Sequence, residues 1–266
     1  MKTRAITGFF FVLVLVAATL FNPYVFAAFF SLVAVLAARE FFNICQSEDT
    51  KPLTQPGTIT ALVLSAVFCF INFGYLQPRS FLLIVPFIVL LFVSSLYLKR
   101  EKPFHDIAYT ILGILYGTVP FLFFISLGFL NKNEFDPYIP LGFLILLWTN
   151  DTGAYLTGRA FGRTKLFERI SPNKTWEGFI GGVLLAIGVS FILNHYFGGL
   201  STYQWIGMAT IIGVFGTLGD LVESMLKRSL GIKDSGQILP GHGGFLDRFD
   251  GLLIAAPLVY SLLLLF

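Results

Sequence analysis

Phe81-Leu-Leu-Ile-Val-Pro-Phe-Ile-Val-Leu-Leu-Phe-Val93 decides the fold, because this stretch is apolar on every side. No water is available inside a bilayer to hydrogen-bond the backbone, so a spanning run of this kind must be helical. The whole chain agrees: 56% of its 266 residues are hydrophobic, 12% are charged, and the mean hydropathy is +0.79. A soluble domain carries about 25% charged residues, and a disordered chain would be polar. The sequence therefore predicts an integral membrane protein.

The fold class that follows is an all-α polytopic membrane protein with about nine transmembrane helices. A helix needs about 20 mostly apolar residues to cross the hydrocarbon core. The first apolar run could also be read as a cleaved signal peptide, but the second follows almost at once, which favours a first spanning helix. The expected spans are Ala5–Phe21, Tyr24–Ile44, Ile59–Leu76, Phe81–Leu98, Ile107–Leu130, Ile139–Phe161, Phe179–Phe197, Trp205–Leu226 and Gly251–Phe266.

Lys and Arg are distributed unevenly between the two sides that these spans define. Of the 18 basic residues, all but Arg79 and Lys132 fall on the side of the N-terminus. Because cytoplasmic loops carry the excess of Lys and Arg, we expect a multi-pass protein of the inner cell membrane. Its N-terminus and the loops after the sixth and eighth spans should be cytoplasmic. No basic helix or aromatic RNA-binding module is visible, so nucleic acid is not an expected partner.

The two halves of the chain differ in where their polar residues lie. In residues 1–130 the charges sit at helix ends, and Arg39 and Glu40 are expected to be membrane-edge residues whose polar groups reach water. In residues 131–266 polar residues run from the loops into the spans. We therefore predict an N-terminal set of anchoring and packing helices (1–130) and a C-terminal catalytic region (131–266).

Two polar clusters open the second half. Asp151 lies inside the sixth span, where a carboxylate is a functional candidate by default, although a hydrogen-bonded packing network is the alternative. Ser171–Gly178 follows, and Ser171 is expected to cap a helix with Pro172 at its first position. Together with Lys174, such a helix start favours a phosphate. A capped helix beside a lysine that reaches water is the alternative.

The third cluster lies at the inner end of the eighth span, before a glycine-rich loop. Carboxylates from two elements, Asp220 and Asp247, could hold a hard cation such as Mg²⁺, which binds one or two carboxylates together with water and substrate phosphates. Basic residues around them could neutralise a polyphosphate. This inventory suits phosphoryl or nucleotidyl transfer, and the membrane edge favours a lipid as one substrate. Residues sharing one helical face there are Asp220, Glu223, Ser224, Lys227 and Arg228.

A resemblance to a known family becomes visible in this loop. Residues 224–250 read Ser-Met-Leu-Lys-Arg-Ser-Leu-Gly-Ile-Lys-Asp-Ser-Gly-Gln-Ile-Leu-Pro-Gly-His-Gly-Gly-Phe-Leu-Asp-Arg-Phe-Asp. This segment closely resembles the signature of the phosphatidate cytidylyltransferases, also called CDP-diacylglycerol synthases. Ser171–Gly178 and Gly219–Ser224 look like further motifs of that family. The resemblance is specific from about Asn150 to the C-terminus, whereas the first half matches in hydropathy and length.

The resemblance implies a reaction and a set of residues for it. CTP and phosphatidate would give CDP-diacylglycerol and pyrophosphate in phospholipid biosynthesis, by in-line attack on the α-phosphorus of CTP. It implies Mg²⁺ and a second, monovalent cation such as K⁺. Membrane lipids and a second copy in a homodimer are further expected partners. The implied metal ligands are Asp220 and Asp247; the residues themselves add Glu223, Asp250 and Asp151 as further candidates. The implied catalytic residues are Asp220, Lys227, Asp247 and Arg248. The implied substrate-binding residues are Ser171, Lys174, Thr175, Glu177, Ser224, Arg228, Lys233, Asp234, His242, Gly243 and Gly244.

Two other functions remain open at this level. A CTP-dependent polyprenol or phytol kinase would transfer the γ-phosphoryl group to a lipid alcohol, but the complete signature argues against it. A secondary transporter with an ion site at mid-membrane depth would use Asp151 and glycine-broken helices. Against the transporter, the polar residues collect in loops, and no inverted repeat relates the two halves.

Overall fold

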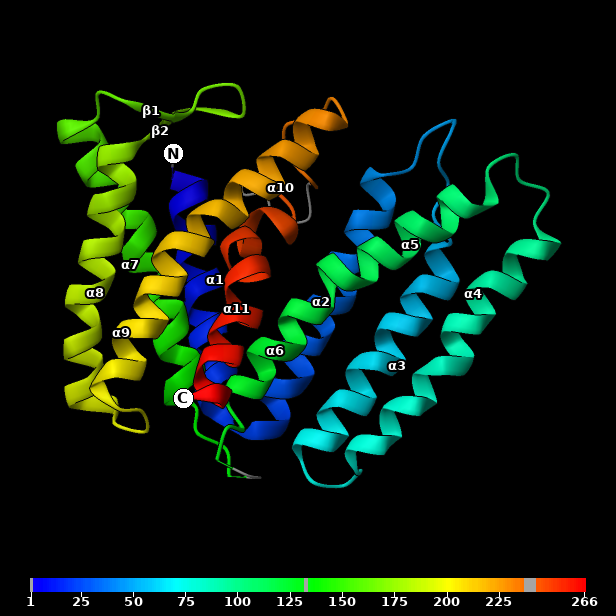
Figure 1. Cartoon of the computed structure of the whole chain (residues 1–266), viewed down its shortest axis with the longest axis horizontal. Helices are drawn as coiled ribbons and strands as arrows, with labels where there is room; N and C mark the ends of the chain where they lie inside the picture. Colours follow the sequence, from blue (N-terminus) through cyan, green and yellow to red (C-terminus); the bar gives the residue numbers. More distant parts are fainter. Residues whose placement is uncertain (1, 132–133, 237–242) are drawn as a thin grey trace.

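The computed structural model describes residues 2–131, 134–236 and 243–266. It is built from helices and one small two-stranded antiparallel sheet (Figure 1). The first part contains α1 (Lys2–Phe21), α2 (Pro23–Ile44), α3 (Thr54–Asn72), the 3-10 segment η1 (Pro78–Ile84), α4 (Val85–Tyr97), α5 (Pro103–Gly117) and α6 (Val119–Leu127). The second part contains α7 (Tyr138–Phe161), β1 (Lys165–Phe167), β2 (Ser171–Thr175), α8 (Trp176–Phe197), α9 (Thr202–Ile211), the π-helical segment η2 (Ile212–Gly216), α10 (Thr217–Ser229) and α11 (Leu246–Leu265).

Each predicted span coincides with a helix or with a run of consecutive helices. Within the described residues, seven of these helices or runs are long and apolar enough to cross a membrane. The other two predicted spans are α1, which contributes the shorter apolar stretch Thr7–Phe21, and α7, whose second half carries polar residues. The all-α polytopic membrane fold is therefore confirmed.

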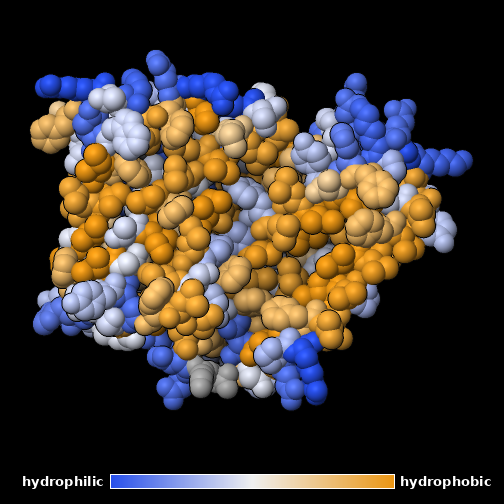
Figure 2. Space-filling view, in the orientation of Figure 1, coloured by the Kyte–Doolittle hydropathy of each residue, from blue (hydrophilic) through white to orange (hydrophobic). Residues whose placement is uncertain are grey.

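The surface has the layered polarity of a membrane protein. Figure 2 shows a broad hydrophobic belt between two hydrophilic edges. Much of α3, η1 and α4 exposes large apolar side chains, as expected where lipid is the solvent. The N-terminus, the β1–β2 hairpin and the C-terminal end of α10 lie at one edge, and the C-terminus lies toward the other (Figure 1). That the first edge faces the cytoplasm stays a prediction. Lys132, one of the two basic residues expected on the opposite side, lies outside the described residues.

Three predicted spans consist of more than one helical segment. The fourth comprises η1 and α4. The fifth breaks at Thr118 into α5 and α6, because Pro120 has no backbone N–H to donate and cannot continue the helical ladder. The eighth consists of α9, η2 and α10, and the π-helical segment η2 lies just before the polar face of α10. Segments of this kind inside α-helices are frequent at functional sites.

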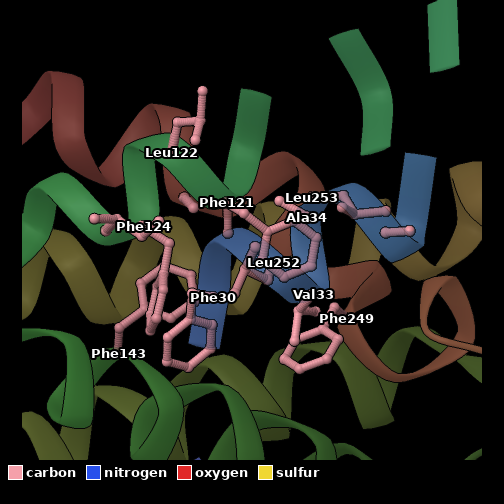
Figure 3. Close-up of a cluster of buried hydrophobic side chains, with 14 of the residues drawn as sticks. Phe30, Val33, Ala34, Phe121, Leu122, Phe124, Phe143, Phe249, Leu252 and Leu253 are labelled. Carbon is pink, nitrogen blue, oxygen red and sulfur yellow. The ribbon is translucent and has the colours of Figure 1, made fainter. Parts of the chain in front are cut away.

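The core joins the two parts of the chain. Aromatic rings from α2, α6, α7 and α11 pack edge to face (Figure 3). The Phe30 and Phe124 ring centroids are 4.7 Å apart, those of Phe124 and Phe143 are 5.4 Å apart, and those of Phe121 and Phe249 are 5.1 Å apart. Such rings combine burial of large area with favourable edge-to-face geometry. The first part thus packs directly on α11, while the predicted functional division at residue 130 stays a prediction.

Gly219 allows a close approach between α10 and α11. A Cβ atom at this position would lie 2.5 Å from the carbonyl oxygen of Asp250, so a larger residue would push the helices apart. Small residues allow this kind of backbone approach between membrane helices. The contact brings the carboxylates that follow Gly219 on α10 next to the first two turns of α11.

The topology can be tested with single cysteines in a variant in which Cys45 and Cys69 are replaced by alanine. Glu168→Cys, at the exposed hairpin tip, and Ser229→Cys, at the exposed end of α10, should be shielded from a membrane-impermeant maleimide in intact cells. Both should react after permeabilisation, because positive loops stay inside. Gln77→Cys, between α3 and η1, is the matched control and should react in intact cells. Labelling of Glu168→Cys or Ser229→Cys from outside would contradict the orientation.

Candidate active site

Three carboxylates converge where α10 meets α11. Asp220 and Glu223 lie one helical turn apart on α10, and Asp250 comes from α11; each offers an oxygen within 4.8 Å of the others. Glu223 is only 1% exposed, and its Oε1 has no hydrogen-bond partner among the described residues. Gathering carboxylates in a low-dielectric region is costly unless a cation compensates them. We call Asp220, Glu223 and Asp250 the acidic triad; it could hold a divalent metal.

Two lysines flank the acidic triad. Lys174 forms an ion pair with Asp220 on one side. On the other side, the Lys227 ammonium lies 2.6 Å from Glu223 Oε2 and 2.6 Å from Asp247 Oδ1. Lys227 is mostly buried, so its charge is poorly screened by solvent. Each lysine therefore offsets part of the negative charge.

Asp247 is held in a network of hydrogen bonds beside the acidic triad. Besides Lys227, its carboxylate accepts hydrogen bonds from the Ser235 N–H, the Ser235 hydroxyl and the Gly244 N–H, all at 2.9 Å. Asp250, rather than Asp247, is the residue of α11 that approaches Asp220 here. The predicted pairing of Asp220 with Asp247 thus stays a prediction, with Lys227 standing between Asp247 and the acidic triad.

Glu40 of α2 joins this network from the other end of the sequence. Its carboxylate is 5% exposed and accepts hydrogen bonds from the Ser235 hydroxyl and from the Phe245 and Leu246 N–H groups. The expectation that Glu40 reaches water at the membrane edge is therefore wrong. Arg39, the preceding residue, is exposed as expected.

A cavity of about 550 Å³ lies between α7, the β1–β2 hairpin, α8 and α10. Asp220 of the acidic triad forms part of its wall, so the triad and the cavity are continuous. Five of the predicted site residues line it: Asp151, Ser171, Lys174, Thr175 and Asp220. Apolar groups of Ala154, Tyr155, Leu166 and Phe179 line it as well, which gives one space both a charged and an apolar wall.

The start of α8 differs from the sequence prediction. Ser171 does not cap a helix; it begins strand β2, which pairs with β1, and Thr175 is the N-cap, its hydroxyl accepting from the Gly178 N–H at 3.2 Å. The reason is local: a residue before proline, here Pro172, is driven to extended backbone. Lys174 accordingly reaches the cavity from a strand and not from a first helical turn.

Glu177 serves the loop rather than the cavity. Its carboxylate accepts hydrogen bonds from the Arg163 N–H at 3.1 Å and the Thr164 N–H at 3.2 Å. These bonds tie the segment after α7 to the first turn of α8. In this structure Glu177 therefore positions the hairpin that carries Lys174.

The remaining predicted substrate-binding residues belong to α10 or to the segment between α10 and α11. The Ser224 hydroxyl donates to Asp220 at 3.3 Å, and Arg228 donates to the Ile232 carbonyl at 3.4 Å. Gly243 has a positive φ of 79° and adjoins the Asp247 carboxylate. His242 lies outside the described residues. Three further predicted residues are exposed and form no ion pair with another described residue: Lys233, Asp234 and Arg248.

Sequence reasoning missed two contributions from the first half of the chain. One is Glu40, and the other is Tyr116 of α5, whose buried hydroxyl has no hydrogen-bond partner among the described residues and interacts electrostatically with the acidic triad. Neither residue belongs to a local motif. The only signal in the sequence was the carboxylate of Glu40 at the end of an otherwise apolar helix. A side chain that reaches water at the membrane edge explains that signal equally well.

Comparison with known proteins decides the family. A family model described as the cytidylyltransferase family matches residues 2–266. The chain belongs to the cytidylyltransferase family. Its membership extends over the first half, where the sequence alone matched only in hydropathy and length.

Several relatives of this cytidylyltransferase-family chain carry the same curated description. The phosphatidate cytidylyltransferase of Staphylococcus aureus strain COL is 38% identical over 270 residues, which cover 99% of each chain. Those of Staphylococcus epidermidis strain RP62A and Staphylococcus haemolyticus strain JCSC1435 are 37% and 35% identical over 269 residues, again covering 99% of each chain. The resemblance read from residues 224–250 is confirmed.

The lysine between the two acidic groups can be tested by stability. Lys227→Met keeps much of the side-chain length but removes the common cation of Glu223 and Asp247, and breaking a buried pair typically costs about 3–5 kcal/mol. We expect a clearly lower midpoint of thermal unfolding in detergent, partly recovered by adding Asp247→Asn. Lys165→Met, at an exposed position of β1, is the control. A Lys227→Met protein as stable as wild type would contradict the ion-pair geometry.

Proposed function

We propose that this chain transfers a cytidylyl group from CTP to phosphatidate, giving CDP-diacylglycerol and pyrophosphate. The observation that carries the proposal is the acidic triad beside a cavity with a charged and an apolar wall. The family and the names of the relatives agree with this reaction. A charged wall suits phosphates, and an apolar wall suits a lipid that arrives from the bilayer.

The basic residues are assigned to substrate phosphates. Lys174 already lies in the cavity, where it faces Asp220 and is available to a phosphate oxygen. Arg228, Lys233 and Arg248 lie on the exposed side, where the charged nucleotide would enter. Arg248 offers a planar fork that can bind phosphate at two oxygens, which a lysine does not. Together these charges hold CTP with its α-phosphorus directed at the lipid phosphate.

The chemistry needs no strong base. A phosphate monoester is already largely ionised near pH 7, so an oxygen of phosphatidate can attack the α-phosphorus without first losing a proton. One P–O bond forms to that oxygen, and the bond from the α-phosphorus to the bridging oxygen of pyrophosphate breaks. The protein contributes positioning and charge neutralisation, as is usual for phosphoryl transfer.

The acidic triad fits a hard divalent cation, and we propose Mg²⁺. The fit rests on three carboxylates with oxygens within 4.8 Å and on Glu223 Oε1, which has no hydrogen-bond partner in the described part of the chain. Bound there, Mg²⁺ would neutralise phosphate charge that develops during the displacement. Asp220 would be the central ligand. Asp250 already lies close enough to Asp220 to share the ion with it. Asp247 would become a ligand only if Lys227 gave up its ion pair with Asp247.

Three further assignments accompany this function. K⁺ is proposed as the second cation, following the resemblance, and Asp151 is its candidate ligand because it faces the cavity. The edge with the hairpin and the end of α10 is proposed to be cytoplasmic, where CTP is available; this follows the charge asymmetry. A homodimer is proposed as the assembly.

The position of the transferred phosphorus tests the function directly. Purified protein in mixed micelles receives phosphatidate, Mg²⁺ and CTP labelled at either the α- or the γ-phosphorus. We expect the α-label in the lipid fraction and the γ-label in water-soluble pyrophosphate, because only the α-phosphorus is attacked. The Asp220→Asn protein, matched in size, gives the background.

Each alternative leaves a different trace when its own substrate is supplied. With a polyprenol or phytol in place of phosphatidate, a lipid kinase would place the γ-label in the lipid and release CDP. A secondary transporter would place neither label in the lipid and would instead move solute into proteoliposomes, which are assayed in parallel. Either result would overturn the proposed function.

A further inference from the structure

Glu40 is a buried carboxylate that the reaction as described does not use. It lies on α2, among helices assigned to anchoring, and Ser235, one of its partners, is 195 residues away in the sequence. Among the residues whose side chains the structure describes (7–131, 134–236 and 243–266), no Lys or Arg forms an ion pair with it. Burying an uncompensated carboxylate costs several kcal/mol, so its surroundings must stabilise the charge in another way.

Three hydrogen-bond donors surround this carboxylate. Glu40 Oε1 accepts from the Ser235 hydroxyl at 2.5 Å and from the Leu246 N–H at 3.1 Å, and Oε2 accepts from the Phe245 N–H at 2.8 Å. Phe245 is the N-cap of α11 and Leu246 is its first residue, and at this end the helix dipole favours a negative charge. Glu40 thus caps α11 from another helix while it holds the segment that contains Ser235.

The glycines around Glu40 match its position. A Cβ atom at Gly244 would lie 2.1 Å from Glu40 Oε1, so only glycine leaves room for the carboxylate there. The signature segment and α2 are therefore fitted to one another. A first half that served only as a membrane anchor would not require this fit.

The contacts continue from Glu40 to the acidic triad. Ser235 binds Asp247 through both its N–H and its hydroxyl, Asp247 binds Lys227, and Lys227 binds Glu223. The Ser235 hydroxyl has one proton for two carboxylates, so Glu40 and Asp247 share it. A shift of Glu40 would be passed to Lys227 through groups in direct contact.

We propose that Glu40 is a positioning residue for cytidylyl transfer. It fixes Ser235 and the start of α11, and through them it sets the orientation of Asp247 and Lys227 beside the acidic triad. It touches neither substrate in this account. The inference rests on the proposed function, because its test measures kcat/KM for that reaction. It is argued from the hydrogen bonds of Glu40.

A double-mutant cycle on kcat/KM for CTP tests the proposal. The proteins are wild type, Glu40→Gln, Ser235→Ala and the double variant. Glu40→Gln keeps the shape but replaces one acceptor oxygen with a donor nitrogen. We expect a loss of about 10–100-fold in kcat/KM, the size typical of groups that orient a metal site's residues. Because both residues act through one contact, the double variant should lose much less than the product of the two single losses.

Matched variants separate positioning from folding. Arg39→Gln, the exposed neighbour on the same helix, should leave kcat/KM unchanged. Glu40→Asp keeps the charge and should recover part of the loss, and the Mg²⁺ concentration for half-maximal rate should rise in Glu40→Gln. If Glu40→Gln fails to insert or fold, Ser235→Ala and Glu40→Asp still report the same chain of contacts: Ser235→Ala should show the loss, and Glu40→Asp should show a smaller one.

Two results would overturn the proposal. One is a wild-type kcat/KM and Mg²⁺ dependence in Glu40→Gln; the other is losses that multiply independently in the double variant. Failure of the proposed function is seen separately, since wild-type protein would then form no CDP-diacylglycerol. In that case the midpoint of thermal unfolding is measured for the same four proteins. The effects of the two substitutions on that midpoint must still be coupled.

Discussion

Negative charge held at the edge of a hydrocarbon layer is the constraint on which this structure depends. Five carboxylates, Glu40, Asp220, Glu223, Asp247 and Asp250, meet within contact of α10 and the start of α11. Such groups are costly in low dielectric unless they are paired. Two lysines, the backbone of the signature segment and the dipole of α11 compensate part of the charge. A divalent cation bound by the acidic triad would compensate the rest.

The two halves of the chain share the site. The second half supplies the acidic triad, the lysines and the cavity, whereas α2 supplies the carboxylate that fixes the signature segment. The aromatic core between α2, α6 and α11 keeps that carboxylate in place. This arrangement explains in physical terms why the family match extends to residue 2 although the recognisable motifs lie near the C-terminus.

Patterns within short stretches of the sequence predicted the features that depend on neighbouring residues alone. Hydropathy located the spans, and helical spacing placed Asp220 and Glu223 on one face. Spacing along one segment could not tell which aspartate of α11 joins Asp220 and Glu223, because that depends on how α11 packs against α10. Ser171 was misplaced because Thr175 offers the same cap, nearer the helix. Glu40 was missed because a contact across 195 residues leaves no local pattern.

The most direct test of this account is the position of a bound divalent cation. Mn²⁺ can replace Mg²⁺ and is located by its anomalous scattering in crystals of the protein, with Asp220→Asn crystals as the comparison. We predict one peak within about 2.1–2.3 Å of an Asp220 oxygen, a separation typical of hard cations and carboxylates, shared with Glu223 or Asp250 and absent from Asp220→Asn. A peak that contacts none of these three carboxylates, or one that persists unchanged in Asp220→Asn, would contradict the account.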